Sequence, residues 1–374
     1  MRAAVLHEVG APLRIEELEL DPPKAGEVSV RMLASGVCHS DVHRADGDWG
    51  EGSIHPIVLG HEGAGVVETL GDGVTGLELG QLVALNWYYP CGACERCAQG
   101  REWLCTGSRS TEHLQMDGTT RIHTSSALDV RAYLSIGTFG ERAVVPAQAA
   151  VPMPEGTPPE VAALIGCCVS TGIGAVVNTA NLLPGVPTVI VGLGGVGLSA
   201  VMGAVLRGAD PIVAVDLDPA KLELAQDLGA THAVSGGDRE AALQEIHRIT
   251  AGGAAVAFET AGVTAAAELT ISSVGRGGTA VLVGLPAVGA RASFEVFGVV
   301  DGSMHIVGSL YGWTVGARDF PLYAHLFLDG RLPLDRLVQE RIGLEDVNRA
   351  MDALRAGQGA RRVIVFEARS ERSP

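Results

Sequence analysis

Four of the seven cysteines lie close together, at positions that could hold a metal ion: Cys91, Cys94, Cys97 and Cys105. Four thiolates at this spacing can close a tetrahedral shell around zinc and leave no position open, which is typical of a structural site. The residues between them are polar or turn-forming, which argues against four unmetallated buried thiols. An iron–sulfur cluster remains an alternative, because a set of four cysteines also suits it.

A second motif that could have a function is a glycine fingerprint, which reads Gly192-Leu193-Gly194-Gly195-Val196-Gly197. It follows an apolar run, and Asp216 stands 19 residues after Gly197, at the end of the next apolar run. In a dinucleotide-binding βαβ unit, such glycines permit a tight turn and close approach of the pyrophosphate to a helix N-terminus. An acidic residue in the place of Asp216 accepts hydrogen bonds from the ribose hydroxyls and repels a 2′-phosphate. We therefore expect NAD rather than NADP, with Lys221 within reach of the same ribose.

The remaining cysteines are Cys38, Cys167 and Cys168, and they are far apart in the sequence. A catalytic zinc needs three protein ligands and one open position for substrate. Candidate partners near the first cysteine and after a later apolar run are Ser40, Asp41, His43, His61 and Glu62. Spacing alone does not assemble these residues into one site.

The elements that must position these residues fall into two classes. Up to about residue 150, short apolar segments stand between glycines and prolines at 28–32, 65–70 and 81–85, which predicts an all-β region. After residue 160, strands are predicted at 188–191, 212–215, 255–259, 279–283 and 305–310, with helices at 194–207, 220–228 and 264–274. The tail adds helices at 321–328 and 344–355 and a closing strand at 362–366. This order predicts an α/β protein with a Rossmann doubly wound parallel sheet and a mainly β second domain.

Length and charge exclude several classes of protein. A chain of 374 residues suits two domains, and a net charge of −16 argues against nucleic acid as a partner. The N-terminus reaches Glu8 before any signal-peptide segment could form, so we expect a cytoplasmic protein, in which clustered cysteines bind metal. Residues 161–206 carry no charge, but their glycines and prolines favour a buried strand and helix over a membrane span.

Several motifs together resemble one known family, in order and in spacing along essentially the whole chain. They are Gly36-Val37-Cys38-His39-Ser40-Asp41, Gly60-His61-Glu62-Gly63-Ala64-Gly65, the four-cysteine lobe, Gly166-Cys167-Cys168-Val169-Ser170-Thr171-Gly172 and the glycine fingerprint. The resemblance is to the zinc-dependent medium-chain alcohol dehydrogenases. It implies a catalytic zinc held by Cys38, His61 and Cys167, with Glu62 behind the metal or as an occasional ligand. It also implies that Asp41 orients His61 and that Cys168 lines the site.

The resemblance carries further roles over to individual residues. Ser40 would take the alcohol proton and pass it through the cofactor ribose to His43 at the surface. His39 stands where the family often has a pyrophosphate-binding arginine, and Arg361 matches a second pyrophosphate contact. Val196 would press against the nicotinamide ring. The residues that match the substrate pocket are Trp87, Tyr133 and Leu134, although the segment 108–138 differs in length and sequence from better-known members.

The resemblance also predicts the architecture. A catalytic GroES-like domain is expected over 1–167 and 311–374, with a zinc lobe at about 90–106, and a Rossmann NAD-binding domain over 168–310. The active site would lie in the cleft at their junction, with domain closure excluding water. The long segment 107–139 resembles that of dimeric members, and residues 305–310 would pair across the axis of a homodimer.

The predicted activity is hydride transfer between an alcohol, expected to be primary and apolar, and NAD, aided by two zinc ions per chain. The main alternative is a thiol-dependent formaldehyde dehydrogenase that acts on an S-hydroxymethyl adduct. Arg109 favours it, since in that subfamily an arginine at this spacing holds the adduct's carboxylate. The stretch 50–55 offers only Glu51 where that subfamily has an acidic pair, which argues against it. A zinc-free reductase-like relative and a binding module without catalysis are further alternatives.

Overall fold

A computed structural model describes residues 1–50 and 54–367 of the chain. These residues form two compact units. Unit 1 comprises Met1–Cys167, Val315–Leu328 and the chain from Val338 onward, and unit 2 comprises Cys168–Thr314 and Asp329–Leu337. The C-terminal part of the chain therefore contributes to both units.

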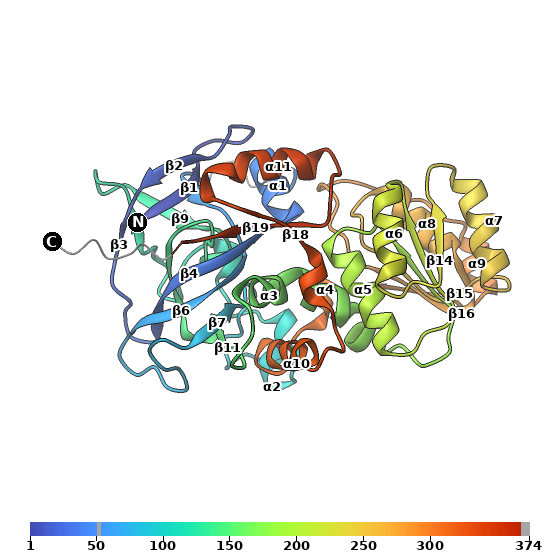
Figure 1. The fold of residues 1–374 in the computed structure, drawn as a ribbon, viewed down its shortest axis with the longest axis horizontal. Helices are drawn as coiled ribbons and strands as arrows, with labels where there is room; N and C mark the ends of the chain where they lie inside the picture. Colours follow the sequence, from blue (N-terminus) through green and yellow to red (C-terminus); the bar gives the residue numbers. More distant parts are fainter. Residues whose placement is uncertain (51–53, 368–374) are drawn as a thin grey trace. The chain divides into compact units, whose positions relative to one another are not determined.

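Unit 1 is built on two mainly antiparallel sheets (Figure 1). The first has the order β2-β1-β5-β9-β8-β3 and contains Arg14–Glu17, Arg2–Leu6, Ile57–Val58, Asp129–Ala132, Ile122–His123 and Glu19–Leu20. The second has the order β11-β7-β6-β4-β19-β18 and contains Ala150–Pro152, Leu82–Leu85, Glu62–Leu70, Glu27–Val37, Arg361–Val365 and Val338–Ile342. Strand β10 (Arg142–Pro146) also pairs with β4. Alternating apolar residues of β4 form a core cluster together with side chains of β6, β7 and β10.

Helices interrupt this β unit, so the expectation of an all-β region before residue 150 was wrong. The helices of unit 1 are α1 (His39–Asp46), α2 (Glu95–Ala98), α3 (Pro159–Leu164), α10 (Gly316–Leu328) and α11 (Val347–Arg355). Helix α1 packs Val42 and Ala45 into a core cluster, and both of its ends are also fixed. Cys38 is its N-cap, Asp41 accepts a hydrogen bond from the Cys38 backbone N–H, and Gly47 ends it with a φ of 78°.

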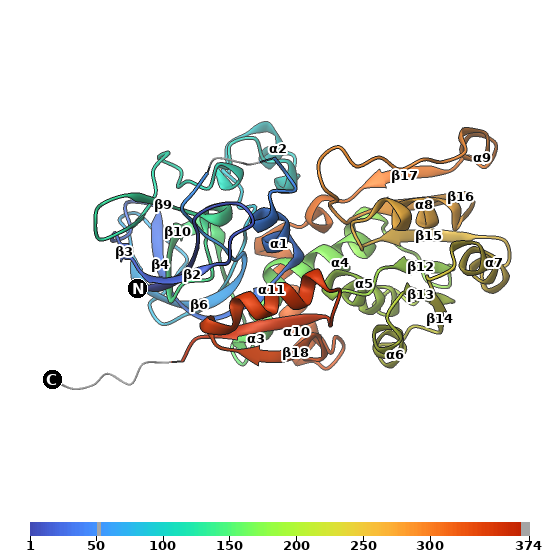
Figure 2. The same ribbon diagram turned by 90° about the horizontal axis from the view of Figure 1, so that it is seen from above.

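Unit 2 is a six-stranded, wholly parallel sheet in the order β14-β13-β12-β15-β16-β17. The strands in that order are His232–Ser235, Ile212–Asp216, Thr188–Val191, Ala254–Glu259, Val274–Leu282 and His305–Gly308. The helices are α4 (Ser170–Gly174), α5 (Gly195–Leu206), α6 (Pro219–Asp227), α7 (Arg239–Ile249), α8 (Thr264–Ser272) and α9 (Val296–Asp301). Helices α5 and α6 lie on one side of the sheet and α8 on the other (Figures 1 and 2), which is the doubly wound arrangement expected from the sequence.

Strand β14 and helices α4, α7 and α9 of unit 2 were not predicted, and strand β17 ends earlier than expected. Strand β14 is mostly exposed, and helix α7 buries only Ala242 and Ile246, so neither has a strong hydrophobic period. The strand expected over 305–310 ends at Gly308, because the chain turns into a short 3₁₀ helix at Leu310.

The most apolar helical run of the described chain, Pro159–Thr179, is long enough to cross a membrane, but 83% of its apolar window is buried inside the structure. It is therefore a core helix. This agrees with the sequence argument from its flanking glycines and prolines. The run contains a π-helical turn at Ile165–Val169, which carries Cys167.

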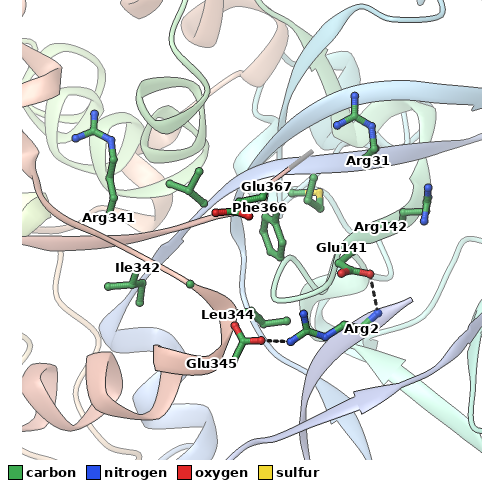
Figure 3. A pocket seen from close by; sticks show the side chains of 13 residues that line it. Arg2, Arg31, Glu141, Arg142, Arg341, Ile342, Leu344, Glu345, Phe366 and Glu367 are labelled. Atoms are coloured by element: carbon green, nitrogen blue, oxygen red, sulfur yellow. Dashed lines mark hydrogen bonds and ion pairs between the residues drawn. The ribbon is translucent and has the colours of Figure 1, made fainter. Parts of the chain in front are cut away.

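A groove of about 630 Å³ opens beside β4, β18 and β19 (Figure 3). Four arginines line it, but each is paired with a carboxylate. Arg2 contacts Glu345, Arg31 and Arg142 both contact Glu68, and Arg341 contacts Glu160. Arg31 and Arg142 share one carboxylate, but Glu141 and Glu367 also line the groove, so it carries no excess of positive charge and does not favour anions.

A buried ion pair ties the segment after the zinc lobe to β4. Arg121 Nε and Nη2 donate to the two carboxylate oxygens of Glu27, at 2.9 and 2.5 Å. The side chains are 1% and 8% exposed, so each charge depends on the other for stabilisation. The opposite end of β4 leads to Cys38, which makes this pair part of the frame of the metal cluster.

Replacing Glu27 by alanine is expected to lower the free energy of unfolding by about 3 kcal/mol, because it leaves a buried guanidinium without its main partner. Urea denaturation of the metal-loaded chain measures this value. The matched control is Glu345→Ala, which removes an exposed partner of Arg2 and should cost less than about 1 kcal/mol. Equal losses in the two variants would contradict the prediction.

Candidate functional site

Three separate segments of unit 1 bring four metal-ligating side chains together. The ligand atoms of Cys38, His61, Glu62 and Cys167 lie within 4.8 Å of one another, and all four residues are buried. Strands β4 and β6 pair with Gly36 opposite Glu62, so the chain leaving β4 meets the chain entering β6. Helix α3 packs against both strands and leads into the π-helical turn that carries Cys167.

Glycine is required where this helical run meets the sheet. A Cβ added to Gly166 would lie 2.8 Å from the carbonyl oxygen of Leu85. Single π-helical turns are often found at functional sites, since they turn a side chain away from its regular helical direction. Nothing in the sequence pattern signals this turn.

A buried aspartate orients the histidine of the cluster. Asp41 Oδ1 lies 3.0 Å from His61 Nδ1 and accepts a hydrogen bond from the Gly60 N–H at 3.1 Å. Its other oxygen accepts from the Cys38 N–H at 3.0 Å. With Nδ1 donating to a carboxylate, the imidazole keeps Nε2 as its metal-binding nitrogen. Two thiolates and an imidazole are the ligand types that zinc prefers, so the residues fit this metal.

The charges within the cluster shift the pKa values of its members, and for Cys38 the shift favours the thiolate form. A hydrogen bond with Cys167 lowers the pKa of Cys38 well below its usual value, and Arg361 and His61 assist against the effect of burial. Burial acts to lower the pKa of His61, but Asp41 and Cys38 outweigh it and raise that pKa. Burial raises the pKa of Glu62 to about 7, despite the opposing charge of Arg361. Cys38 is thus poised as a thiolate, the form that binds metal.

Arg361 lies against the cluster rather than at a distance from it. Its Nε donates to Glu62 Oε2 at 3.2 Å, and its Nη2 lies 3.2 Å from Glu62 Oε1 and 3.4 Å from Cys38 Sγ. Antiparallel pairing of β19 with β4 places it there. The assignment of Arg361 to the cofactor pyrophosphate stays a prediction. The ion pair with Glu62 was not foreseen, because no sequence pattern links residues so far apart.

The predicted proton relay lies on and beside α1. Ser40 Oγ is 3.8 Å from Cys38 Sγ. His43 was expected at the surface, yet its side chain is only 18% exposed and its Nδ1 lies 2.6 Å from Asp48 Oδ2. The ring of His39 is 4.9 Å from that of His43, and burial together with His43 lowers the pKa of His39. Asp48, which the sequence reasoning missed, fixes the tautomer of His43.

Two predicted substrate-pocket residues flank the metal-binding imidazole. The rings of Trp87 and Tyr133 stand edge-on to His61, with centroid separations of 6.5 and 5.6 Å. Leu134 follows, with 8% exposure and a left-handed φ of 50°. A non-glycine residue in this conformation costs about 1–2 kcal/mol, so the fold must hold this turn in place. The aromatic walls suit an apolar substrate.

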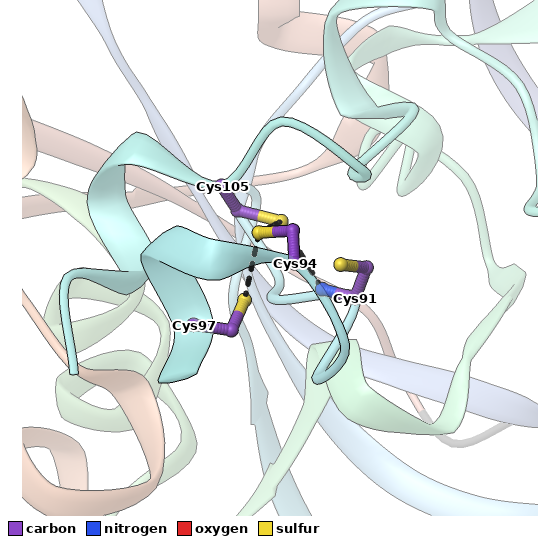
Figure 4. Close-up of side chains that lie close together, drawn as sticks. All are labelled: Cys91, Cys94, Cys97 and Cys105. Atoms are coloured by element: carbon purple, nitrogen blue, oxygen red, sulfur yellow. Dashed lines mark hydrogen bonds between the residues drawn. The ribbon is translucent and has the colours of Figure 1, made fainter. Parts of the chain in front are cut away.

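The four cysteines of the lobe also converge (Figure 4). Cys94 Sγ lies 3.6 Å from Cys97 Sγ and 3.9 Å from Cys105 Sγ. Tetrahedral zinc with Zn–S bonds of about 2.3 Å requires sulfur atoms about 3.8 Å apart, so these separations fit zinc. The Cys91 N–H also donates to Cys105 Sγ at 3.2 Å, a contact that steadies a thiolate. The lobe is therefore well formed for a closed zinc site.

The glycine fingerprint has the geometry of a dinucleotide site. Gly192 has a φ of 91°, and a Cβ on Gly197 would lie 1.8 Å from the Gly192 carbonyl oxygen. A Cβ on Gly194 would instead meet open space, which is where a pyrophosphate could approach the N-terminus of α5. Gly195 begins that helix, and Val196 follows it, half-buried. The residues present fit a dinucleotide.

Asp216 ends β13 beside this loop. Its Oδ2 accepts a hydrogen bond from the Leu193 N–H at 2.6 Å, and its Oδ1 accepts from the Asp218 N–H at 3.0 Å. Asp218 caps α6, and Lys221 lies in the first turn of that helix. The acidic residue thus stands next to the fingerprint, as the sequence spacing predicts.

Comparison with known proteins decides the family. Residues 24–155 match the alcohol dehydrogenase GroES-like domain, and residues 195–328 match the zinc-binding dehydrogenases. The S-(hydroxymethyl)glutathione dehydrogenase of Paracoccus denitrificans is 36% identical, over 98% of this chain and 99% of its own. This chain belongs to the zinc-dependent alcohol dehydrogenase family.

Solved structures of this family have the same fold. An alcohol dehydrogenase zinc-binding domain protein from Burkholderia ambifaria has a TM-score of 0.92 and 34% identity, covering 98% of this chain and 99% of that chain. Benzyl alcohol dehydrogenase from Acinetobacter calcoaceticus has a TM-score of 0.91 and 30% identity, with the same coverage. The family resemblance and the fold class inferred from the sequence are confirmed.

Replacing Asp41 by asparagine is expected to weaken zinc binding at the Cys38–His61–Cys167 cluster by about 10- to 100-fold, since it removes the charge that orients His61. Competition with a chromogenic chelator measures the affinity. Asp48→Asn is the matched control, because it alters an aspartate–histidine pair beside the same helix without touching a ligand. An unchanged affinity in Asp41→Asn would refute the role given to Asp41.

Proposed function

We propose that this alcohol dehydrogenase transfers a hydride between a primary, apolar alcohol and NAD, and so interconverts the alcohol and its aldehyde. The observation that carries this proposal is the convergence of Cys38, His61 and Cys167. Three ligands leave one position of a tetrahedral zinc for substrate. The aromatic rings of Trp87 and Tyr133 beside His61 support an apolar alcohol.

The proposal requires two zinc ions and one NAD per chain. When bound, the catalytic zinc supplies a Lewis acid for the alcohol oxygen and NAD supplies the hydride acceptor. Cys91, Cys94, Cys97 and Cys105 would hold the second zinc as a purely structural ion. The NAD contacts would come from Gly192, Gly194, Gly195, Val196 and Gly197, together with Asp216, Lys221, His39 and Arg361. The closed thiolate lobe and the open space at Gly194 support these assignments.

The protein side chains would then move the proton. Ser40 would accept it from the alcohol, and His43 would deliver it to solvent. Asp48 supports this role, because its contact with Nδ1 holds the ring of His43 in one orientation. Glu62 would remain behind the metal ligands, held by Arg361.

We further propose that unit 1 is the catalytic domain, that unit 2 is the NAD-binding domain, and that the protein is a cytoplasmic homodimer. Within the described chain, β17 pairs only with β16, so its other edge can accept a strand from a second copy. Nearby side chains in and before α9 are apolar and exposed: Leu285, Val288, Phe294, Val296, Phe297 and Val300. Such a patch is typical of a surface covered in an oligomer.

A second activity is supported by one specific observation. The relative from Paracoccus denitrificans is named as an S-(hydroxymethyl)glutathione dehydrogenase. Arg109, the residue that could hold an adduct's carboxylate, lies 3.1 Å from Glu112 Oε2 and is 40% exposed. A neighbouring carboxylate competes with such a ligand, so we rank simple alcohols first. Glu51, which entered the sequence argument, lies outside the described residues.

Replacing Cys38 by serine is expected to abolish alcohol-dependent NAD reduction and to lower the zinc content from two ions per chain to one, because the catalytic site loses a thiolate. Elemental analysis and circular dichroism report metal content and fold. Cys94→Ser is the matched variant, since it should remove the other zinc. Full turnover in Cys38→Ser would eliminate the proposed chemistry.

Replacing Asp216 by asparagine is expected to lower kcat/KM for NAD by about tenfold and to raise it for NADP, since the charge that binds the ribose and repels a 2′-phosphate is lost. Steady-state kinetics with both cofactors provide the measurement. Asp218→Asn, which preserves the helix cap, serves as the control. A preference for NAD that survives in Asp216→Asn would show that Asp216 does not select the cofactor.

A substrate panel is expected to show turnover of benzyl and medium-chain primary alcohols without added thiol. Formaldehyde with glutathione or another thiol should be slower, because the rings beside His61 suit an apolar substrate, and because Glu112 competes, by about 1 kcal/mol or less, for the guanidinium of Arg109. Glu112→Gln tests that competition, with Glu95→Gln in the zinc lobe as its control. Turnover that depends on a thiol would establish the alternative activity instead.

A further inference from the structure

We propose that His113 is a positioning residue that sets the shape of the substrate pocket, and with it the selectivity among alcohols. The inference rests on the proposed alcohol dehydrogenase activity. His113 belongs to the segment after the zinc lobe, and it contacts Leu134 and Tyr133. It acts through the turn that carries Tyr133 and Leu134.

This turn has an uncommon backbone. Leu134 and Ser135 are consecutive non-glycine residues with φ values of 50° and 64°. Residues other than glycine rarely adopt this left-handed region, and a pair of them persists only where the surroundings fix it. Strained backbone of this kind is concentrated at ligand-binding sites. The turn therefore needs an external support.

The segment 109–115 supplies that support through several hydrogen bonds. The Leu134 N–H donates to His113 Nδ1 at 3.1 Å. The Ser135 hydroxyl donates to the carbonyl oxygen of Leu114 at 2.6 Å, and Gln115 Nε2 donates to the carbonyl oxygen of Ser135 at 3.2 Å. Of these bonds, only the one from His113 fixes the backbone of Leu134 itself.

The histidine is held in one form. Its side chain is buried, with the residue 1% exposed, and its backbone N–H donates to the carbonyl oxygen of Ser110 at 3.0 Å. Because Nδ1 accepts from the Leu134 N–H, a neutral imidazole must carry its proton on Nε2. The ring also packs against Tyr133, at a centroid separation of 5.4 Å. His113 thus contacts both pocket residues.

The turn contacts Ser40 and His61 through Tyr133. The Tyr133 hydroxyl donates to the carbonyl oxygen of Ser40 at 3.5 Å, and its ring stands edge-on to His61 at 5.6 Å. A shift of the Leu134 backbone would move this ring relative to the metal ligand and the relay serine. Misplacements of about 1 Å near a reacting centre change rates by about 100-fold. Selectivity between small and aromatic alcohols should be most sensitive to such a shift.

The experiment compares three variants of the full zinc- and NAD-loaded enzyme. His113→Leu removes the acceptor while keeping an apolar side chain, and His113→Asn restores an acceptor oxygen near the position of Nδ1. Thr120→Val is the matched control in the same segment, because it loses a buried hydrogen bond to the Val130 carbonyl oxygen of β9 but leaves the hydrogen bond between His113 and Leu134 in place. The readout is the ratio of kcat/KM for benzyl alcohol to that for ethanol.

We expect this ratio to change by about tenfold in His113→Leu, with KM affected more than kcat, and to return towards the original value in His113→Asn. An unchanged ratio in His113→Leu, or an equal change in Thr120→Val, would overturn the inference. If the unaltered enzyme oxidises no alcohol at all, the proposed function fails. A second measurement still tests whether His113 accepts the hydrogen bond from the Leu134 N–H.

That measurement is nitrogen NMR of the unaltered protein with ¹⁵N-labelled histidine, assigned by comparison with His113→Asn. An Nδ1 resonance of an unprotonated, hydrogen-bonded nitrogen and a proton on Nε2 would support the role of His113. A proton on Nδ1 would exclude it, since that nitrogen could not then accept from Leu134.

Discussion

One buried carboxylate organises the metal cluster. Asp41 accepts hydrogen bonds from the side chain of His61 and from the backbone N–H groups of Cys38 and Gly60. Two of these donors belong to Cys38 and His61, and the third belongs to Gly60, next to His61. The carboxylate of Asp41 therefore fixes the orientation of both Cys38 and His61. The same residue stabilises the first turn of α1, which carries Ser40 and His43. The positions of Cys38 and His61, and the start of the helix that carries the proposed relay residues, therefore depend on a single buried side chain.

The cluster also shows how a mainly β unit assembles a site from distant segments. Strand pairing between β4 and β6 brings Cys38 and His61 together, and the core helical run adds Cys167 through a π-helical turn. Strand β19 returns from the end of the chain and places Arg361 on Glu62. Each contribution comes from a rigid, buried element. Such a frame holds the four side chains close together before metal binds, so that binding requires little further loss of conformational entropy.

Motifs with short spacing in the sequence predicted several parts of the candidate sites. The four-cysteine lobe, the fingerprint before α5 and the position of Asp216 follow from spacing, because each lies within one short structural unit. The catalytic set came only from the family resemblance, since no spacing rule connects Cys38 with Cys167. Helix α7 and strand β14 escaped prediction because they bury few side chains. The Arg361–Glu62 pair and the turn at Leu134 depend on tertiary contacts that no local pattern records.

The two sulfur clusters differ in their access to water. Cys38 and Cys167 are buried with their histidine, whereas Cys91, Cys94 and Cys97 of the lobe are only partly covered. A dissolved oxidant or chelator therefore reaches the lobe more easily than the buried cluster. Damage to the enzyme would begin as loosening of this surface loop, and the reaction centre would be affected only afterwards. Exposure to solvent thus separates the two cysteine groups of the described chain.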